Sequence, residues 1–461
     1  MSKLIRNLLE TRSHEKFQLH EQALNHQMVR VLKTIGYDRD YCHASGPHLY
    51  DAYDNKYLDL LSGWGALALG RNHPRVNGAL REVCDQDLPN LVQMDVSALS
   101  GILAEKLLAT APGDGLQKVF FSNSGTEAVE AALKMARFAT GRETIVYCDH
   151  GFHGLSYGAL SVNGDENFRE GFTPLLPKCQ NVPFNDLEAL ETALADKPAA
   201  FIVEPIQGKG VNMPDDDYLR EAKRLCEKHG TLFIADEIQT GLGRTGAMWA
   251  VEHWGVEPDL LLTAKALSGG QVPVGAVLSR KWVFDAVFSR MDRAAVHGST
   301  FGKNNMAMAA GIATLHVIEE ENLVAHTARM GERLIAALSE FRDRHEFVQE
   351  VRGKGLMIAM EFGQPRSMKL RASWTLLEKT NKSLFSQMIL VPLFSEHRVL
   401  AQVAGHNMHV IKFLPPYVID DNDADWIISS MDQTIGDCHR VPGSIWNLGR
   451  KLAGHALTER A

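Results

Sequence analysis

The sequence predicts an α/β fold in which a mostly parallel sheet is flanked by helices and accompanied by a smaller α+β domain. Between about residue 75 and residue 320, short β-branched or apolar runs alternate with helical stretches, which is typical of a parallel sheet covered by helices. The 461 residues are 45% hydrophobic and 23% charged. This is an ordinary globular composition with enough apolar residues for a large core.

Segments with the composition of buried strands recur along this region. They are Lys118–Phe121, Thr144–Cys148, Ala200–Val203, Leu232–Ala235, Leu260–Thr263 and Val274–Leu278. The intervening segments Thr126–Ala139 and Asp217–His229 carry apolar residues at helical spacing. Gly141 and Gly230 follow them, at the positions where helices should end.

The two ends of the chain differ from this central region. Val324–His345 has helical spacing, and short strands are expected near Gly355–Phe362 and His409–Phe413. Because neither end is long enough to be stable alone, we expect both ends to combine into the smaller domain. The expected divisions are residues 1–74 and 326–461 for the smaller domain and residues 75–325 for the large one.

Charge and cysteine usage narrow the class of protein. The net charge of −8 and a pI near 6.2 lack the basic excess that nucleic acid or an anionic membrane selects. The six cysteines form no CxxC pair and have no histidine at metal-ligand spacing, so no metal site is expected. No apolar signal region begins the sequence, and no run approaches the roughly 18 apolar residues of a membrane span. We expect a cytoplasmic protein that acts on small molecules.

A strand runs through a turn of small residues into a helix in FFSNSGTEAVEAALKMAR, residues 120–137. Ser124, Gly125 and Thr126 open this helix, where free backbone N–H groups and the positive end of the helix dipole attract an anion. Gly125 also lets a phosphate approach the main chain closely. Many α/β proteins contain such a turn, so phosphate binding and a purely structural turn are both open at this point.

Two further strand ends carry reactive side chains. Asp236 and Glu237 end the strand in TLFIADEIQTGLGRTG, at the sheet edge where α/β proteins bind ligands; a metal ligand, a helix cap and the partner of a ring nitrogen are the alternatives there. Lys265 follows three leucines in PDLLLTAKALSGG. A lysine there is either paired or chemically used, or it reaches the surface. Apolar surroundings would lower its pKa and permit a Schiff base.

Together these three segments meet the requirements of pyridoxal phosphate, which needs a lysine, an acid for the ring nitrogen and a phosphate cradle at a helix start. The order FFSNSGTEAVEAA, YCDHGFHG, EPIQG, ADEIQTGLGRTG, LLTAKALSGG and HGSTFGKN resembles the class III (ω-) aminotransferases of fold-type I, over nearly the whole chain. The ornithine, acetylornithine and GABA aminotransferases are among these. The resemblance implies a seven-stranded sheet, and ping-pong transfer of an amino group from an amine or amino acid to a keto acid or aldehyde.

The resemblance also implies roles for the residues of these motifs. Lys265 would hold the cofactor as an imine and, once freed by an incoming amine, move a proton from the substrate. Asp236 would pair with the ring nitrogen and keep it protonated. Gly125 and Thr126 would bind the phosphate through their backbone, with Ser124 shaping the loop.

Five further residues follow from the same comparison. Phe152 would stack on the pyridine ring, Ile238 would pack on its opposite face, and Gln239 would reach its phenolic oxygen. Glu204 would organise nearby hydrogen bonds. Thr300 would cross to the phosphate of a neighbouring subunit, which implies a homodimer or a dimer of dimers. The structural alternatives are a core role for Phe152, capping by Glu204 and a local turn at Thr300.

The substrate is less well specified. Many ornithine- and GABA-type relatives have a glutamate after EPIQG and an arginine before the later PP motif, whereas this chain has Lys209 and Lys412 there. Ornithine or GABA specificity therefore does not carry over. If both lysines face the pocket, an anionic substrate group is favoured; if they point into solvent, no such preference follows. Trp64 would line the pocket or serve in packing.

Other functions are compatible with parts of this pattern. The same cofactor site supports an aminomutase or a decarboxylase when its surroundings differ. A non-catalytic regulatory protein is the alternative from a different class, and the presence of both Lys265 and Asp236 counts against it.

Overall fold

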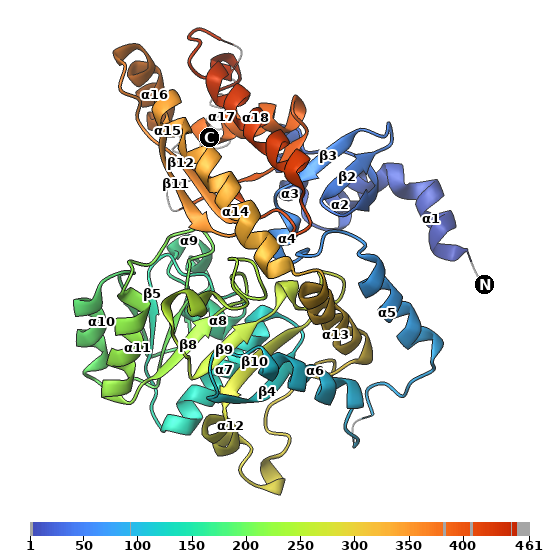
Figure 1. The fold of residues 1–461 in the computed structure, drawn as a ribbon, viewed down its shortest axis with the longest axis vertical. Helices are drawn as coiled ribbons and strands as arrows, with labels where there is room; N and C mark the ends of the chain where they lie inside the picture. The colour runs from blue at the N-terminus through green and yellow to red at the C-terminus, as the bar shows by residue number, and fades with distance from the viewer. Residues whose placement is uncertain (1–2, 93, 381–383, 406–408, 444, 450–461) are drawn as a thin grey trace.

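The computed structural model describes residues 3–92, 94–380, 384–405, 409–443 and 445–449. A seven-stranded sheet forms the core of its larger part, which is the lower half in Figure 1. Its strands are β4 (Leu116–Ser122), β5 (Ile145–Cys148), β6 (Cys179–Val182), β7 (Ala200–Val203), β8 (Leu232–Asp236), β9 (Leu260–Thr263) and β10 (Gly275–Arg280). The strand order is β4-β10-β9-β8-β7-β5-β6. Only β10 runs antiparallel to its neighbours among these strands, so the predicted mostly parallel, seven-stranded sheet is confirmed.

Helices cover both faces of this sheet. They include α5 (Pro74–Asp85), α6 (Ala98–Ala109), α7 (Gly125–Thr140), α8 (Tyr157–Ser161), α9 (Glu166–Arg169), α10 (Leu187–Leu194), α11 (Tyr218–His229), α12 (Lys281–Val287) and α13 (Asn305–Glu320). Successive strand residues point to opposite faces. Leu260 and Leu262 pack in the cluster that contains α7, whereas Leu261 packs with α11 and α13. Burial on both faces explains why the strands are continuous apolar runs.

The helices that were expected at α7 and α11 end where the sequence places their glycines. Gly141 and Gly230 have φ values of 68° and 62°, a left-handed conformation that glycine adopts readily and that ends many helices.

The rest of the chain forms two smaller sheets and their helices. The first contains β1 (Tyr41–Ser45), β2 (His48–Asp51), β3 (Lys56–Asp59) and β13 (Val399–Leu400); the second contains β11 (Val348–Lys354), β12 (Met357–Phe362), β14 (Gln402–Ala404) and β15 (Val410–Phe413). β13 pairs with β3 in parallel, so the two ends of the chain share one sheet. The domain boundaries stay a prediction.

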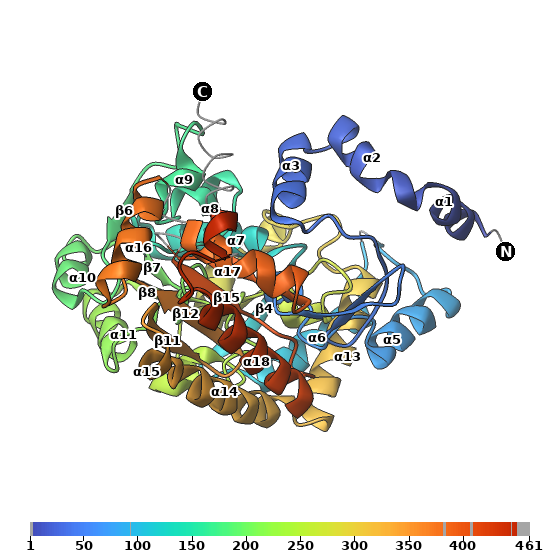
Figure 2. The same ribbon diagram turned by 90° about the horizontal axis from the view of Figure 1, so that it is seen from above.

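The accompanying helices are α1 (Leu4–Arg12), α2 (Lys16–Ala23), α3 (His26–Ile35), α4 (Ser62–Gly65), α14 (Leu323–Ser339), α15 (Phe341–Arg344), α16 (Met368–Thr380), α17 (Leu384–Ser395) and α18 (Asp421–Asp437). Figure 2 shows α1 and α2 projecting from the body of the molecule, and α1 buries none of its residues. Among the described helices, none is long and apolar enough to cross a bilayer.

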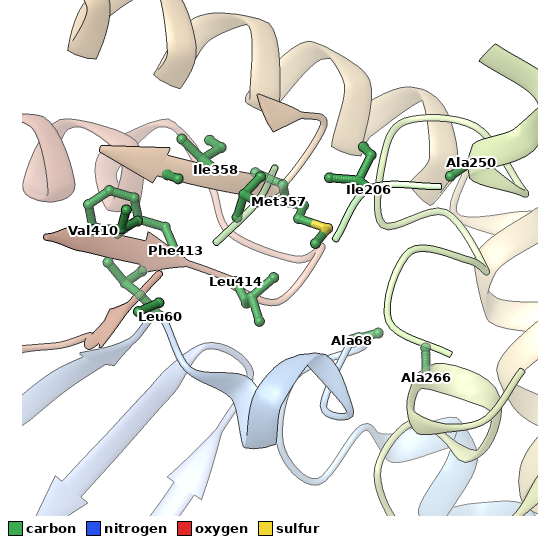
Figure 3. Close-up of a cluster of buried hydrophobic side chains, with 14 of the residues drawn as sticks. Leu60, Ala68, Ile206, Ala250, Ala266, Met357, Ile358, Val410, Phe413 and Leu414 are labelled. Carbon is green, nitrogen blue, oxygen red and sulfur yellow. The ribbon is translucent and has the colours of Figure 1, made fainter. Parts of the chain in front are cut away.

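Apolar contacts join the smaller sheets to the large one. Leu60 and Ala68 come from the N-terminal part, Ala266 from the segment after β9, and Met357 and Leu414 from the C-terminal part (Figure 3). All five side chains belong to one buried cluster. The ends of β8 and β9 therefore lie close to residues from both ends of the chain, and the candidate site is built at this junction.

Candidate active site

Lys265 begins the short 3-10 helix η3 (Lys265–Ser268) directly after β9. Its φ of 33° lies in the left-handed region, which costs energy for a residue with a side chain and recurs at functional sites. Burial lowers the pKa of Lys265, and the charge of Arg244 adds to this shift, while Asp236 and Glu204 oppose it. A lowered pKa increases the fraction of neutral amine, which is the nucleophilic form.

Asp236 ends β8 and is only 3% exposed. One carboxylate oxygen, Oδ2, lies 2.7 Å from Nδ1 of His153, and the other accepts the backbone N–H of Ile238 at 3.1 Å. Burial by itself would lower the pKa of His153, but the hydrogen bond to Asp236 and the charges of Asp236 and Glu204 outweigh it and raise that pKa. The two side chains therefore form a buried, hydrogen-bonded pair.

The turn between β4 and α7 lies against the same segment. Ser124 caps α7 by accepting the N–H of Glu127 at 3.3 Å. A Cβ atom on Gly125 would lie 2.9 Å from Cδ1 of Ile238, so only glycine fits without movement of that side chain. The hydroxyl of Thr126 lies 2.7 Å from that of Ser156. The backbone N–H of Thr126 lies in the first turn of α7, where N–H groups have no partner within the helix.

The side chain of Glu204 is hydrogen-bonded to the backbone of Phe152. The backbone N–H of Phe152 donates to Oε1 of Glu204 at 2.8 Å, and the N–H of Gly208 donates to Oε2 at 2.8 Å. Burial raises the pKa of Glu204. The carboxylate thus holds the Phe152 turn and the EPIQG turn together.

Gln239 connects two of the predicted substrate residues. Its Nε2 donates to the carbonyl oxygen of Trp64 at 2.9 Å, and its Oε1 accepts from Nζ of Lys412 at 2.6 Å. Lys412 is buried and also donates to the carbonyl oxygen of Gly208. Burial, and next the charge of Lys265, lower the pKa of Lys412 to about 7. Trp64 is 65% exposed.

Lys209 follows the EPIQG turn in the chain, but its side chain contacts different residues from those that Lys412 contacts. Its ammonium pairs with the carboxylate of Asp165 and lies 5.2 Å from the centroid of the Phe168 ring. Burial lowers the pKa of Lys209. Its positive charge is thus directed at Asp165, away from the contacts that Lys412 makes.

Thr300 is exposed, on the loop that precedes α13. The neighbouring Ser299 accepts a hydrogen bond from the side chain of Asn123, next to the turn that opens α7. The loop therefore reaches the edge of the candidate phosphate site, while Thr300 itself faces outward.

Two residues of this site were not identified from the sequence. His153 stands in the GFHG motif that was used only for Phe152, and its contact to Asp236 spans 83 positions. Arg244, in GLGRTG, is fully buried, donates to the carbonyl oxygen of Leu356 at 3.0 Å and lies 4.6 Å from the centroid of the Tyr417 ring. A charged or titratable residue inside an apolar motif was the available signal for both.

Comparison with known proteins identifies the family. Residues 34–435 match the family model described as aminotransferase class-III. The chain belongs to this family. The cofactor of this family is pyridoxal phosphate. The family and the cofactor that the motifs predicted are therefore both confirmed.

Individual relatives agree with this assignment. The chain is 36% identical to the aminotransferase PigE of Serratia sp. over 444 residues, which cover 89% of this chain and 52% of PigE, so it spans about half the length of that relative. It is 44% identical over 329 residues to the acetylornithine aminotransferase of Methanopyrus kandleri, covering 71% of this chain and 81% of that protein. A structure of the ornithine aminotransferase from Toxoplasma gondii, with partial occupancy of the cofactor, superposes with a TM-score of 0.78 at 29% identity, covering 91% and 97% of the two chains.

The residues present fit the cofactor of this class. The glycine that packs on Ile238 leaves the start of α7 open to a phosphate, and Ile238 in turn hydrogen-bonds Asp236. Asp236 is a buried carboxyl group placed to accept a ring N–H. Lys265 lies close enough to Asp236 and Glu204 for their charges to affect its pKa.

Proposed function

We propose that this protein transfers an amino group from an amine or amino acid, of the ω-amino type, to a keto acid or aldehyde. The observation that carries the proposal is the convergence at one sheet edge of Lys265, the Asp236–His153 pair and the turn at Gly125. Family membership supports the reaction class. The donor, the acceptor and the subunit arrangement are proposals about this chain.

The roles of the reactive side chains follow from their chemistry. Pyridoxal phosphate supplies an electron sink for the electron pair left when a C–H bond beside the substrate nitrogen breaks. Nζ of Lys265 holds the cofactor and, once displaced by the incoming amine, takes the proton from that carbon, for which its lowered pKa suits it. Asp236 accepts the ring N–H, and His153 stabilises the negative charge of Asp236.

The remaining cofactor residues bind and orient. Backbone N–H groups of Gly125 and Thr126 bind the phosphate at the start of α7, with Ser124 as the helix cap. Phe152 and Ile238 hold the two faces of the ring by apolar contact.

Gln239 and Glu204 fix polar groups around the cofactor. Gln239 presents its amide N–H₂ on the side opposite Lys412, because its oxygen accepts from that lysine. Glu204 holds the Phe152 turn against Gly208. For the substrate we assign Lys412 as the group that meets an anionic end and Trp64 as part of the pocket wall.

The protein is also proposed to act as a homodimer in which Thr300 reaches the phosphate of the partner subunit. Thr300 is exposed. Exposed large apolar side chains that a partner could cover include its neighbour Phe301 and Trp64, whose carbonyl oxygen accepts from Gln239. Val96 and Met94 are exposed as well.

Hybrid dimers test this arrangement. Lys265→Ala subunits mixed with Thr300→Ala subunits should form one complete site, with Lys265 from one chain and Thr300 from the other. That site should bind the cofactor as tightly as a wild-type site. If Thr300 acts within its own chain, mixing restores nothing.

The reaction class is tested by its dependence on an acceptor. The purified holoenzyme should convert one equivalent of an amine to its carbonyl product without an acceptor and turn over continuously only when a keto acid or aldehyde is added. Continuous turnover without an acceptor, giving an isomeric amine or carbon dioxide, would instead identify an aminomutase or a decarboxylase.

A further inference from the structure

Lys209 forms a largely desolvated ion pair. Its side chain is 21% exposed and that of its partner Asp165 is 3% exposed. A buried carboxylate needs a charged or hydrogen-bonding partner. Asp165 obtains one from Lys209 and another from Asn167, whose backbone N–H donates to Oδ1 at 3.0 Å.

Asp165 lies in a segment that is hydrogen-bonded to the turn containing Phe152. Asn163, two residues earlier, accepts the backbone N–H of His153 at 2.6 Å and donates to the carbonyl oxygen of Gly154 at 2.8 Å. The chain from Asn163 to α9 is thereby held against the turn at one end, and the pair with Lys209 holds it at Asp165.

Phe168 on α9 contacts Phe152 edge to face. Their ring centroids are 5.3 Å apart and the ring planes are inclined at 66°. The Lys209 ammonium lies over the Phe168 ring at 5.2 Å, within the range of a cation–π contact. Phe168 is thus held between the lysine and Phe152.

The backbone closes this set of contacts into a ring. Phe152 donates to Glu204, Glu204 accepts from Gly208, and Gly208 precedes Lys209 in the chain. The Phe152 ring is therefore constrained from its backbone by Glu204 and from its side chain by Phe168. Both constraints come from the segment between Glu204 and Lys209: Glu204 holds the backbone of Phe152, and Lys209 contacts Phe168.

We propose that Lys209 is a positioning residue which, through Asp165 and Phe168, fixes the ring of Phe152 against the cofactor. This rests on the proposed function, in which Phe152 stacks on pyridoxal phosphate. Lys209 thereby acts on the cofactor through other side chains and makes no contact with the substrate.

The test uses the holoenzyme and two readouts besides turnover. One is the dissociation constant of pyridoxal phosphate, and the other is the visible circular dichroism of the bound cofactor, which reports how the ring is held. Lys209→Ala, Asp165→Asn and Phe168→Leu should each weaken cofactor binding about 2- to 10-fold, the range of an aromatic pair. Each should change the circular dichroism in the same direction.

Coupling and rescue distinguish positioning from general damage. The Lys209→Ala/Asp165→Asn double variant should be no worse than the worse single variant, because both remove one contact. Lys209→Arg should retain wild-type values. Lys228→Ala, which breaks an exposed ion pair to Glu191, should leave both readouts unchanged, and far-ultraviolet circular dichroism checks folding.

Three outcomes would decide against the proposal. Wild-type cofactor affinity and visible spectra in Lys209→Ala and Asp165→Asn would overturn it, as would additive effects in the double variant. A loss confined to anionic substrates in Lys209→Ala would show that the lysine contacts the substrate. If Phe152→Leu also left both readouts unchanged, the stacking role in the proposed function would fail first.

Discussion

The imidazole of His153 lies 2.7 Å from the carboxylate of Asp236, and both side chains are almost completely buried. Burial alone would favour neutral groups. The hydrogen bond and the neighbouring carboxylates nevertheless raise the pKa of His153, which favours the charged form of the imidazole. A carboxylate stabilised in this way can remain an anion when a ring N–H is presented to it.

Asp236→Asn should slow the half-reaction with an amine substrate by about 10²- to 10³-fold, the effect of removing one key electrostatic partner. The side chain keeps its shape, so folding should survive. Single-turnover kinetics measure the rate, with Asp217→Asn, in an exposed pair with Arg220, as the control. Near-normal turnover would contradict the assigned role.

His153→Gln should have a smaller effect in the same assay. It keeps a hydrogen-bond donor for Asp236 but removes the titratable imidazole, so the loss should stay below the about 1.5–3 kcal/mol that a hydrogen bond to a charged group contributes. In the Asp236→Asn background the histidine substitution should add little, because its partner has already been altered.

The large sheet could be predicted because its strands are buried on both faces. Leu260–Thr263 was predicted with its observed bounds, since every position in it is apolar or buried. β6, one of the two edge strands, was missed because its sequence, Cys179–Val182, is mostly polar and only Val182 of it is buried. An edge strand lacks the continuous apolar run that identifies a central one.

The contacts within the site could be predicted only in part. The motifs located Lys265 and Asp236, because each directly follows an apolar strand. They could not show that Lys209 pairs with Asp165 while Lys412 lies beside Gln239. Those partners are separated by tens or hundreds of residues, and only the folded chain brings them together.

Lys265→Ala should bind pyridoxal phosphate without a covalent bond to the protein. Borohydride treatment of the wild-type holoenzyme followed by peptide mapping should find the phosphopyridoxyl group on Lys265, which is partly buried and has a lowered pKa. The alanine variant should carry no label. A label on Lys412, a buried lysine beside the site, would require the roles of the two residues to be exchanged.

Lys412 should make stability depend on pH. Its folded pKa of about 7 lies below the ordinary lysine value of 10.5, so between these values the unfolded chain binds more protons, and the free energy of unfolding rises with pH. The slope is at most about 1.4 kcal/mol per pH unit for one group. Denaturant titrations of the cofactor-free protein measure it.

Lys412→Met should remove this contribution and flatten the pH dependence between pH 7 and 10.5. Lys228→Met, which removes an exposed lysine, should keep the wild-type slope. Equal slopes in all three proteins would show that Lys412 is not held in an environment that disfavours its charge.

The last prediction separates the two lysines by their effect on substrate choice. The ammonium of Lys412 is buried beside Gln239 and near Lys265, whereas that of Lys209 pairs with Asp165. Lys412→Ala should reduce kcat/KM for anionic substrates by about 10-fold or more relative to neutral amines and aldehydes of matched length, because a charge-assisted hydrogen bond is lost. Lys209→Ala should leave that ratio unchanged.

The pH dependence of the same ratio provides an independent check. Since the pKa of Lys412 is about 7, its ammonium loses its proton as the pH rises through that value, and the preference for anionic substrates should decline with it in the wild type. In Lys412→Ala the ratio should not vary over that range. A wild-type preference that is independent of pH, or equal ratios in wild type and Lys412→Ala, would mean that another group recognises the anion.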